Sequence, residues 1–196
     1  MGLSGGLYDS QKRPIQQLNG ELVMVSGRYL YLGEQLSFPR ARLTQALGVQ
    51  GVRNVAPLYL GISEWLNQQT HQQKQALLFA IAPENPALKL PELANQAVLL
   101  QRSDSLLFDT RSKHNAGPVV AMVKQQGYYD TELQGVRARV VGLFTMGLTF
   151  AADINLITSA TNFKNYFPSQ SADDIQMGVI QLDPGVDPVR VKATLA

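Results

Sequence analysis

The chain has 196 residues, a formal net charge of +2, 45% hydrophobic residues and no cysteine. This composition is typical of a folded globular chain, and the lack of cysteine excludes disulfides, thiolate nucleophiles and Cys-ligated zinc or iron–sulfur sites. Basic residues are spread along the chain without a run of like charge, so nucleic-acid binding has little support, and no stretch approaches the roughly 20 apolar residues of a membrane-spanning helix.

The first 83 residues predict two helices and three strands. Apolar residues at near-helical spacing open the chain, at Leu3, Leu7, Ile15 and Leu18. A strand is expected over 21–26, and a helix over 37–47 with Ser37 as its cap and Leu43 and Leu47 on one face. Two further strands, 52–65 and 72–82, are joined by the polar turn 67–71, which predicts a hairpin.

Residues 84–149 are richer in short elements. Prolines 83, 86 and 91 suggest a boundary at the start of this section. A short helix is expected over 92–100, a strand over 106–109, and an amphipathic helix over 117–126 with Val119, Val120 and Val123 inward. Strands 128–133 and 136–145 are expected to pair across Gln134–Gly135, a tight hairpin turn.

The last section predicts strand and helix again. Ile154, Leu156 and Ile157 form a buried strand, and Ser159 caps a helix that runs to about Tyr166. A strand over 174–182 and a turn at 183–185 follow. Asp187 caps the final helix, with Pro188 in its first turn and Val189, Lys192 and Leu195 at helical spacing.

The first and last sections therefore share an order of strand and helix, while the middle section differs. A split α+β domain formed by 1–83 and 150–196, with an insertion at 84–149, explains this order better than two domains in series.

Catalytic and metal-binding patterns are weak. The two histidines, His71 and His114, lie in polar loops outside metal-binding spacings, and the sequence has no GxSxG elbow and no phosphate-binding loop. Asp104, Asp109 and the Asp173–Asp174 pair are interpreted as solvated turn residues. No catalytic, metal-binding or cofactor-binding residue is therefore nominated, and a hydrolase using Asp and Ser groups stays an alternative.

Several aromatic residues are candidates for an interface or for the core. Tyr128 and Tyr129 lie at a loop edge, where period 2 turns one ring inward and the other outward. Trp65 ends a strand and suits either a core or an interface. Phe163, Tyr166 and Phe167 have helical spacing and are expected in the core.

Five segments carry a family resemblance over nearly the whole chain and in order. The segments 48–65, 77–93, 105–118, 136–163 and 175–191 resemble the periplasmic domain of DevC-type permeases. These permeases are the membrane subunits of cyanobacterial ABC exporters, relatives of the MacB-like group. Residues 7–10 also look like the region that follows the first membrane helix of such permeases.

The resemblance implies a two-lobed α+β fold and a non-enzymatic role. The fold has a discontinuous porter-like βαβ lobe and a smaller inserted mixed α/β lobe, which matches the split above. ATP hydrolysis is then expected in a separate cytoplasmic subunit, with no cofactor bound here. The domain is expected on the periplasmic face of the inner membrane.

The implied partners are a hexameric membrane-fusion adaptor protein and, through it, an outer-membrane TolC-like channel. The implied cargo is a glycolipid or another hydrophobic compound. The full-length permease is expected to form a homodimer, whereas the excised domain is expected to be monomeric. A free-standing periplasmic ligand-binding module is the other alternative.

No fixed contact motif transfers from the family to this chain. The nominated partner-contact residues come from exposed loops of the inserted part: Arg111, Lys113 and His114 in one loop, and Tyr128 and Tyr129 near another.

Overall fold

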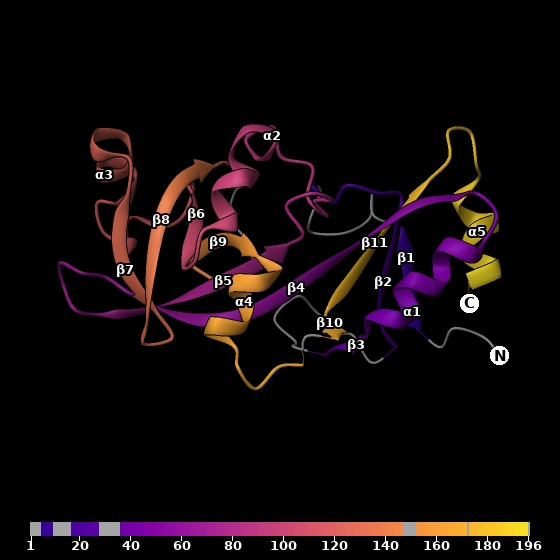
Figure 1. Cartoon of the computed structure of the whole chain (residues 1–196), viewed down its shortest axis with the longest axis horizontal. Coiled ribbons are helices and arrows are strands. Elements are labelled where there is room, and N and C mark those ends of the chain that lie inside the picture. Colours follow the sequence, from indigo (N-terminus) through magenta and orange to yellow (C-terminus); the bar gives the residue numbers. More distant parts are fainter. Residues whose placement is uncertain (1–4, 10–16, 28–35, 147–151, 172, 196) are drawn as a thin grey trace.

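The computed structural model describes residues 5–9, 17–27, 36–146, 152–171 and 173–195. Most strands belong to one nine-stranded sheet with the order β1-β2-β11-β4-β5-β9-β6-β8-β7 (Figure 1). Its strands are β1 (Gly5–Asp9), β2 (Leu22–Ser26), β4 (Val52–Leu66), β5 (Gln73–Ile81), β6 (Ser105–Asp109), β7 (Tyr129–Leu133), β8 (Val136–Phe144), β9 (Ile154–Ser159) and β11 (Met177–Leu182).

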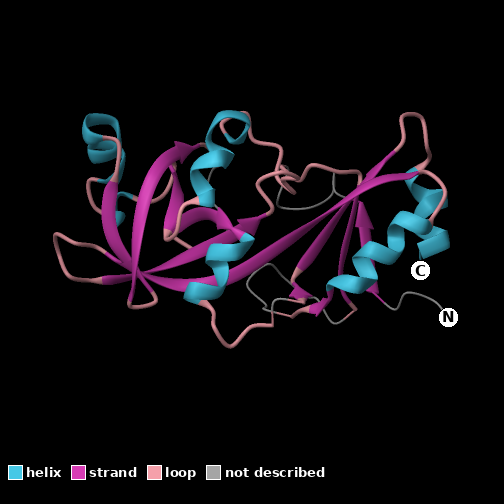
Figure 2. Ribbon diagram, in the orientation of Figure 1, coloured by secondary structure: helices cyan, strands magenta, loops and turns pink. Residues whose placement is uncertain are grey.

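Helices and short elements flank this sheet (Figure 2). The helices are α1 (Arg40–Gln45), α2 (Leu93–Gln96), α3 (Val119–Gln126), α4 (Ala160–Tyr166) and α5 (Pro188–Leu195), with short 3₁₀ turns η2 (Ala46–Gly48), η3 (Ala97–Gln101) and η4 (His114–Ala116). A separate two-stranded pair joins β3 (Phe38–Pro39) to β10 (Asp174–Ile175). Among the described residues, no helix is long and apolar enough to cross a membrane.

Strand β4 runs through both ends of the molecule. Its first half, from Val52 to Leu58, pairs with β11, and its second half, from Leu58 to Leu66, pairs with β5 on the other side. Figure 1 shows β4 crossing the molecule from α5 and β1 at one end to β7, β8 and α3 at the other. The two ends therefore share one continuous piece of backbone.

The strands near α3 close into a barrel-like ring. From the second half of β4 the pairing runs through β5, β9, β6, β8 and β7, and Leu133 of β7 pairs back with Trp65 of β4. The backbone N–H of Gln134 donates to Glu64 at 2.9 Å and the Thr131 hydroxyl donates to the Leu66 carbonyl at 2.7 Å, so the closure is hydrogen-bonded.

The apolar residues divide between the two faces of the sheet. One cluster includes the inward residues of α1, α3, α4 and α5, such as Leu43, Val123, Phe163 and Val191. The other cluster lies under α2 and the proline-rich segment 83–93, where Leu88, Leu90 and Leu93 pack on the sheet. Burial of side chains at this scale is the main force that holds the layers together.

Several predicted elements are confirmed. The hairpin of β4 and β5, the buried strand β9, the helix α4 and the hairpin of β7 and β8 lie where the sequence predicts them. Ser159 caps α4, because its hydroxyl oxygen accepts a hydrogen bond from the Asn162 N–H at 3.2 Å. Phe163, Tyr166 and Phe167 are buried, as expected.

The helix predicted over 37–47 begins later than expected. Phe38 and Pro39 are extended and pair with Ile175 and Asp174, so α1 starts at Arg40 and Ser37 does not cap it. Leu47 is 47% exposed, because the chain tightens into the 3₁₀ turn η2 and buries Ala46 beside Leu43 instead. Tertiary pairing has overridden the local helix signal here.

The helix expected at the start of the chain and the strand expected over 174–182 also differ from the structure. Residues 5–9 form a strand paired with β2, because two glycines disfavour a helix and the edge of β2 supplies a partner. Leu3 and Ile15, two other residues of the expected helix, lie outside the described residues. The later strand is divided into β10 and β11 at Gln176, a buried residue whose side-chain oxygen accepts from the Leu60 N–H at 2.9 Å.

The predicted split into 1–83 with 150–196 and an insertion at 84–149 stays a prediction. Strand β9, from the last section, pairs with β5 of the first section on one side and with β6 of the middle section on the other. The three sections therefore contribute to one continuous sheet.

Candidate partner-docking surface

Trp65 anchors the end of the molecule that carries β7 and α3. Its indole is buried and its N–H donates to the Ala116 carbonyl at 2.9 Å. The ring stacks on Tyr129 with centroids 6.3 Å apart and meets Phe108 at 5.6 Å. Trp65 is therefore a core residue, and it holds the loop 110–118 against the barrel.

Asn67 joins two neighbouring loops. Its side-chain amide donates to the Asn115 carbonyl at 2.8 Å, and its side-chain oxygen accepts from the Gln69 N–H at 2.9 Å and the Thr70 N–H at 3.2 Å. The loop of the β4–β5 hairpin and the loop 110–118 are thus linked through one buried side chain.

Asp109 holds the base of the same loop. The interpretation of Asp109 as a solvated turn residue is therefore wrong. Its carboxyl is fully buried, and it accepts from the Arg111 N–H at 3.0 Å, the Met146 N–H at 3.2 Å and the Asn155 side-chain amide at 3.0 Å. A buried carboxylate needs such donors to offset the loss of water. Because those donors come from separate segments, sequence spacing alone had no signal for this role.

The predicted contact residues of the loop 110–118 are exposed where the structure describes them. Arg111 and Lys113 are both exposed, and the Lys113 ammonium lies 2.5 Å from a carboxylate oxygen of Asp153. The hydrogen bond from Lys113 lowers the pKa of Asp153. The backbone of His114 belongs to η4, while its side chain lies outside what the structure describes.

The two tyrosines face opposite sides, as period 2 predicts. Tyr128 is 39% exposed, whereas Tyr129 is buried against Trp65, and burial raises the pKa of Tyr129. Tyr129 therefore contributes to the core, and only Tyr128 of the pair presents its ring on the surface.

Tyr128 belongs to a small charged and aromatic cluster. The guanidinium carbon of Arg139 lies 4.5 Å from the centroid of the Tyr128 ring. Arg139 also donates to both carboxylate oxygens of Asp130, at 2.6 and 2.9 Å, across directly paired positions of β7 and β8. The bidentate pair lowers the pKa of Asp130 and holds the Arg139 guanidinium over the ring.

Two groups of surface residues at this end, Arg111 and Lys113 in the loop after β6 and Tyr128, Asp130 and Arg139 on the β7–β8 hairpin, are together named the distal surface. An exposed aromatic ring beside a bidentate Arg is the kind of group that anchors protein interfaces. Arg139 and Asp130 were not nominated from the sequence, although the facing positions of the predicted hairpin already placed them opposite each other.

Two hollows lie away from the distal surface. One, of about 610 Å³, is lined mainly by apolar residues of the segment 83–97, including Pro83, Pro86 and Leu90. The other, of about 230 Å³, lies beside α5. Among the described residues, no three His, Asp or Glu side chains lie together so as to hold a metal ion.

Comparison with known proteins identifies the fold. No known protein family and no curated protein matches the sequence. The chain is similar to the extracellular domain of the noncanonic ABC-type transporter YknZ from Gram-positive bacteria, with a TM-score of 0.54 and 14% identity over 81% of this chain and 78% of that one. It is also similar to the periplasmic region of MacB from Actinobacillus actinomycetemcomitans, with a TM-score of 0.50 and 12% identity over 87% of this chain and 73% of that one.

At these identities the likeness establishes the fold alone. The predicted α+β fold of the MacB-like periplasmic type is confirmed: a large mixed sheet with several helices.

Proposed function

We propose that this chain is the periplasmic or extracellular domain of the permease subunit of an ABC exporter. In this role it docks a partner protein through its distal surface and transmits ATP-driven movement from the membrane. The observation that carries the proposal is the fold likeness to the external domains of two ABC transporters, which extends over 81% and 87% of the chain.

The arrangement of the elements supports this role. Helix α5 and strand β1 lie against each other at one end, which allows both to connect to a membrane on the same side (Figure 1). The distal surface lies at the opposite end, and β4 joins the two through a continuous run of paired residues. In the proposed role, a displacement at the end with α5 travels along this strand to the distal surface.

The finer parts of the proposal come from the family resemblance of the sequence segments. We infer a DevC-type cyanobacterial permease whose ATP is hydrolysed by a separate cytoplasmic subunit. Its partners are a hexameric membrane-fusion adaptor and, indirectly, a TolC-like channel, and its cargo is a glycolipid or another hydrophobic compound. The same inference includes a homodimeric permease, a location on the periplasmic face of the inner membrane, and the two lobes at 1–83 with 150–196 and at 84–149.

Binding to the cognate membrane-fusion adaptor protein tests the proposal. We expect the chain to bind the immobilised adaptor hexamer, and Arg111→Glu combined with Tyr128→Ala to weaken that binding at least tenfold, since an interface anchor contributes upwards of about 1–2 kcal/mol. Lys164→Glu, on the exposed side of α4, is the matched control and should bind like the wild type.

Two results would contradict the proposal. Absence of binding to the adaptor at the highest soluble concentration of the chain would argue against the docking role. Equal weakening by the distal variant and the Lys164→Glu control would remove the distal surface as the docking site.

A further inference from the structure

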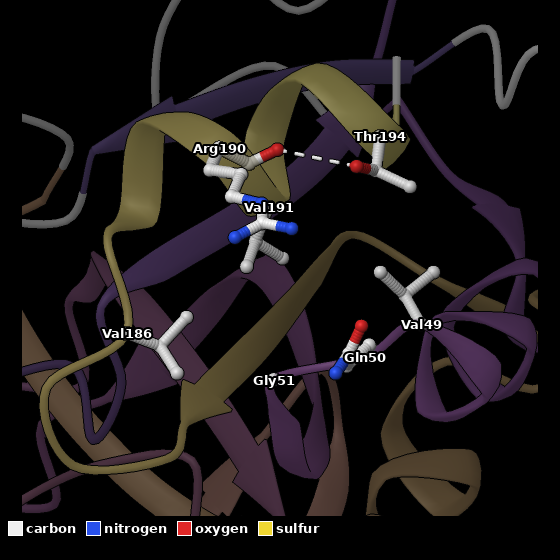
Figure 3. Close-up of a pocket in the computed structure, with 7 residues that line it drawn as sticks. All are labelled: Val49, Gln50, Gly51, Val186, Arg190, Val191 and Thr194. Atoms are coloured by element: carbon white, nitrogen blue, oxygen red, sulfur yellow. Dashed lines mark hydrogen bonds between the residues drawn. The ribbon is translucent and has the colours of Figure 1, made fainter.

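The hollow beside α5 combines a cation with apolar walls. Its lining residues are Val49, Gln50, Gly51, Val186, Arg190, Val191 and Thr194, and its volume is about 230 Å³. Figure 3 shows Arg190, Val191 and Thr194 on α5 facing Val49 and Gln50 of the segment that leads into β4. The hollow therefore lies between the last helix and the start of the shared strand.

Exposed apolar side chains adjoin both walls of this hollow in the chain. Val189, next to Arg190, is 73% exposed, and Leu47, two residues before Val49, is 47% exposed. Neither side chain belongs to the buried face of its element, which is formed by Val191 and Leu195 in α5 and by Ala46 in η2. Single exposed apolar residues are common, so this feature needs the charge distribution beside it to indicate a partner.

Two of the segments at this end, which also contains β1, β2 and β11, together carry more cations than carboxylates. Residues 40–53 contain three arginines and no carboxylate, while 183–195 contain Arg190 and Lys192 against Asp183 and Asp187. Five cations against two carboxylates leave these segments with a net charge of +3, whereas the whole chain carries +2. The remainder of the chain carries a net charge of −1, although residues 110–129 near the other end also contain three cations and no carboxylate.

The charges of α5 are available to an outside partner. Among the described residues, the ion pairs are Lys113–Asp153 and Arg139–Asp130, and neither involves Arg190 or Lys192. The nearest carboxylate in the chain, Asp187, caps the helix by accepting from the Val189 N–H at 2.9 Å. Arg190, with its guanidinium, and Lys192, with its ammonium group, are both exposed on α5.

We propose that this end, with Arg190, Lys192 and Val189 as its contact residues, rests on the surface of an anionic lipid bilayer. The cations then lie near lipid phosphates, and Val189 reaches the boundary between headgroups and acyl chains. The proposal rests on the proposed function, which puts the end with α5 next to a membrane, and it adds that this end binds the lipid surface itself. Such a contact fixes the tilt of the domain relative to the bilayer and thereby the direction in which the distal surface points.

Vesicle co-sedimentation with the whole chain tests this contact. We expect binding to phosphatidylcholine vesicles that contain one third phosphatidylglycerol, no binding to pure phosphatidylcholine vesicles, and loss of binding as salt is raised. Each lost cation should weaken binding roughly fivefold, so Arg190→Gln with Lys192→Gln should weaken it more than tenfold. The change Val189→Asp should also weaken binding of the chain to the same vesicles.

Lys124→Glu with Arg137→Glu, on exposed positions of α3 and β8, is the control with at least as large a change in net charge. Far-UV circular dichroism checks that every variant keeps its fold. Retained vesicle binding by the control and loss by the α5 variant supports the proposal. Equal loss by both variants, or no binding of the wild type to anionic vesicles, overturns it.

Adaptor binding separates this proposal from the proposed function. The α5 variant should bind the adaptor like the wild type, because the distal surface is intact. Loss of adaptor binding with unchanged vesicle binding would make the end with α5 a protein interface and would overturn the lipid contact. Failure of the vesicle experiment with normal adaptor binding would leave the exporter role in place.

Discussion

At the scale of single residues, the distal end depends on buried polar side chains as much as on apolar ones. Asn67 and Asp109 each make three hydrogen bonds to partners in loops and in the neighbouring elements β9 and η4. A buried polar group that loses its partner costs about 1–3 kcal/mol, so these loops are ordered by a few specific contacts.

Asn67→Ala should therefore destabilise the protein by about 1–3 kcal/mol, because it leaves the Asn115 carbonyl and two backbone N–H groups without their partner. The shift of the urea midpoint measures the effect, and hydrogen exchange should rise in the loop 110–118. Gln68→Ala, at an exposed neighbouring position, is the control and should change the midpoint little. An unchanged midpoint for Asn67→Ala would show that water replaces the side chain.

Asp130 provides a prediction about pH. Its hydrogen bonds to Arg139 lower its pKa in the folded state below the ordinary value of 3.8, so its contribution to stability is present above that pH and is lost as the pH falls through the folded-state pKa. Asp130→Asn should thus be less stable than the wild type at neutral pH, and the difference should shrink below about pH 3.8.

The effect of Asp130→Asn should be small, because the pair with Arg139 is exposed and screened by solvent. Thermal unfolding across a pH series measures it, with Asp173→Asn at an exposed position outside any described ion pair as the control. A difference that stays constant down to acid pH would show that the carboxylate charge has no part in the effect.

At the scale of elements, hairpin turns and caps decide where strands and helices end. Gln134 and Gly135 join β7 to β8 with φ values of 54° and 70°, the positive pair typical of a type I′ turn. A side chain at such a position is strained, and glycine is the residue that accepts it most readily.

Gly135→Ala should cost roughly 1–2 kcal/mol, because alanine in the left-handed region brings its Cβ too close to the next carbonyl. Gly48→Ala is a matched control, since neither glycine has an atom within 4 Å of an added Cβ, while only Gly135 has a positive φ. We expect Gly48→Ala to be neutral or slightly stabilising, as measured by thermal unfolding. Equal losses at both positions would contradict the backbone explanation.

At the scale of the whole molecule, β4 makes the two ends one folding unit. One half of β4 pairs with β11 and the other half pairs with β5. A single apolar cluster extends from Leu195 of α5 to Trp65 of the barrel. Separation of the two ends would break the pairing of this strand and divide the cluster.

The chain should accordingly unfold in one cooperative transition. Trp65 is the only tryptophan and lies in the barrel, so its fluorescence reports on one end, while far-UV circular dichroism reports on the whole sheet. The urea transitions from the two signals should coincide. A fluorescence transition that precedes or follows the dichroism transition would show that the ends unfold separately.

Local patterns in the sequence predict much of this fold. The strand β9, the cap at Ser159, the helix α3 and the hairpin at Gln134–Gly135 each depend on neighbours within a few residues, and each is confirmed. The exposure of Tyr128 and the burial of Tyr129 follow from the same period of 2. The family resemblance of the segments likewise predicts the α+β fold that the comparisons support.

What depends on distant residues could not be predicted in the same way. Residues 5–9 are a strand because β2 offers them an edge, Phe38 is extended because Ile175 pairs with it, and Asp109 is buried because donors from three segments converge on it. The sequence by itself therefore determined which segments are strands and helices wherever short-range periodicity, turns and caps prevail. The tertiary structure alone decided the closure of the barrel, the burial of Trp65 and the positions of the distal surface and the hollow beside α5, because pairing and burial between remote segments outweigh local preference.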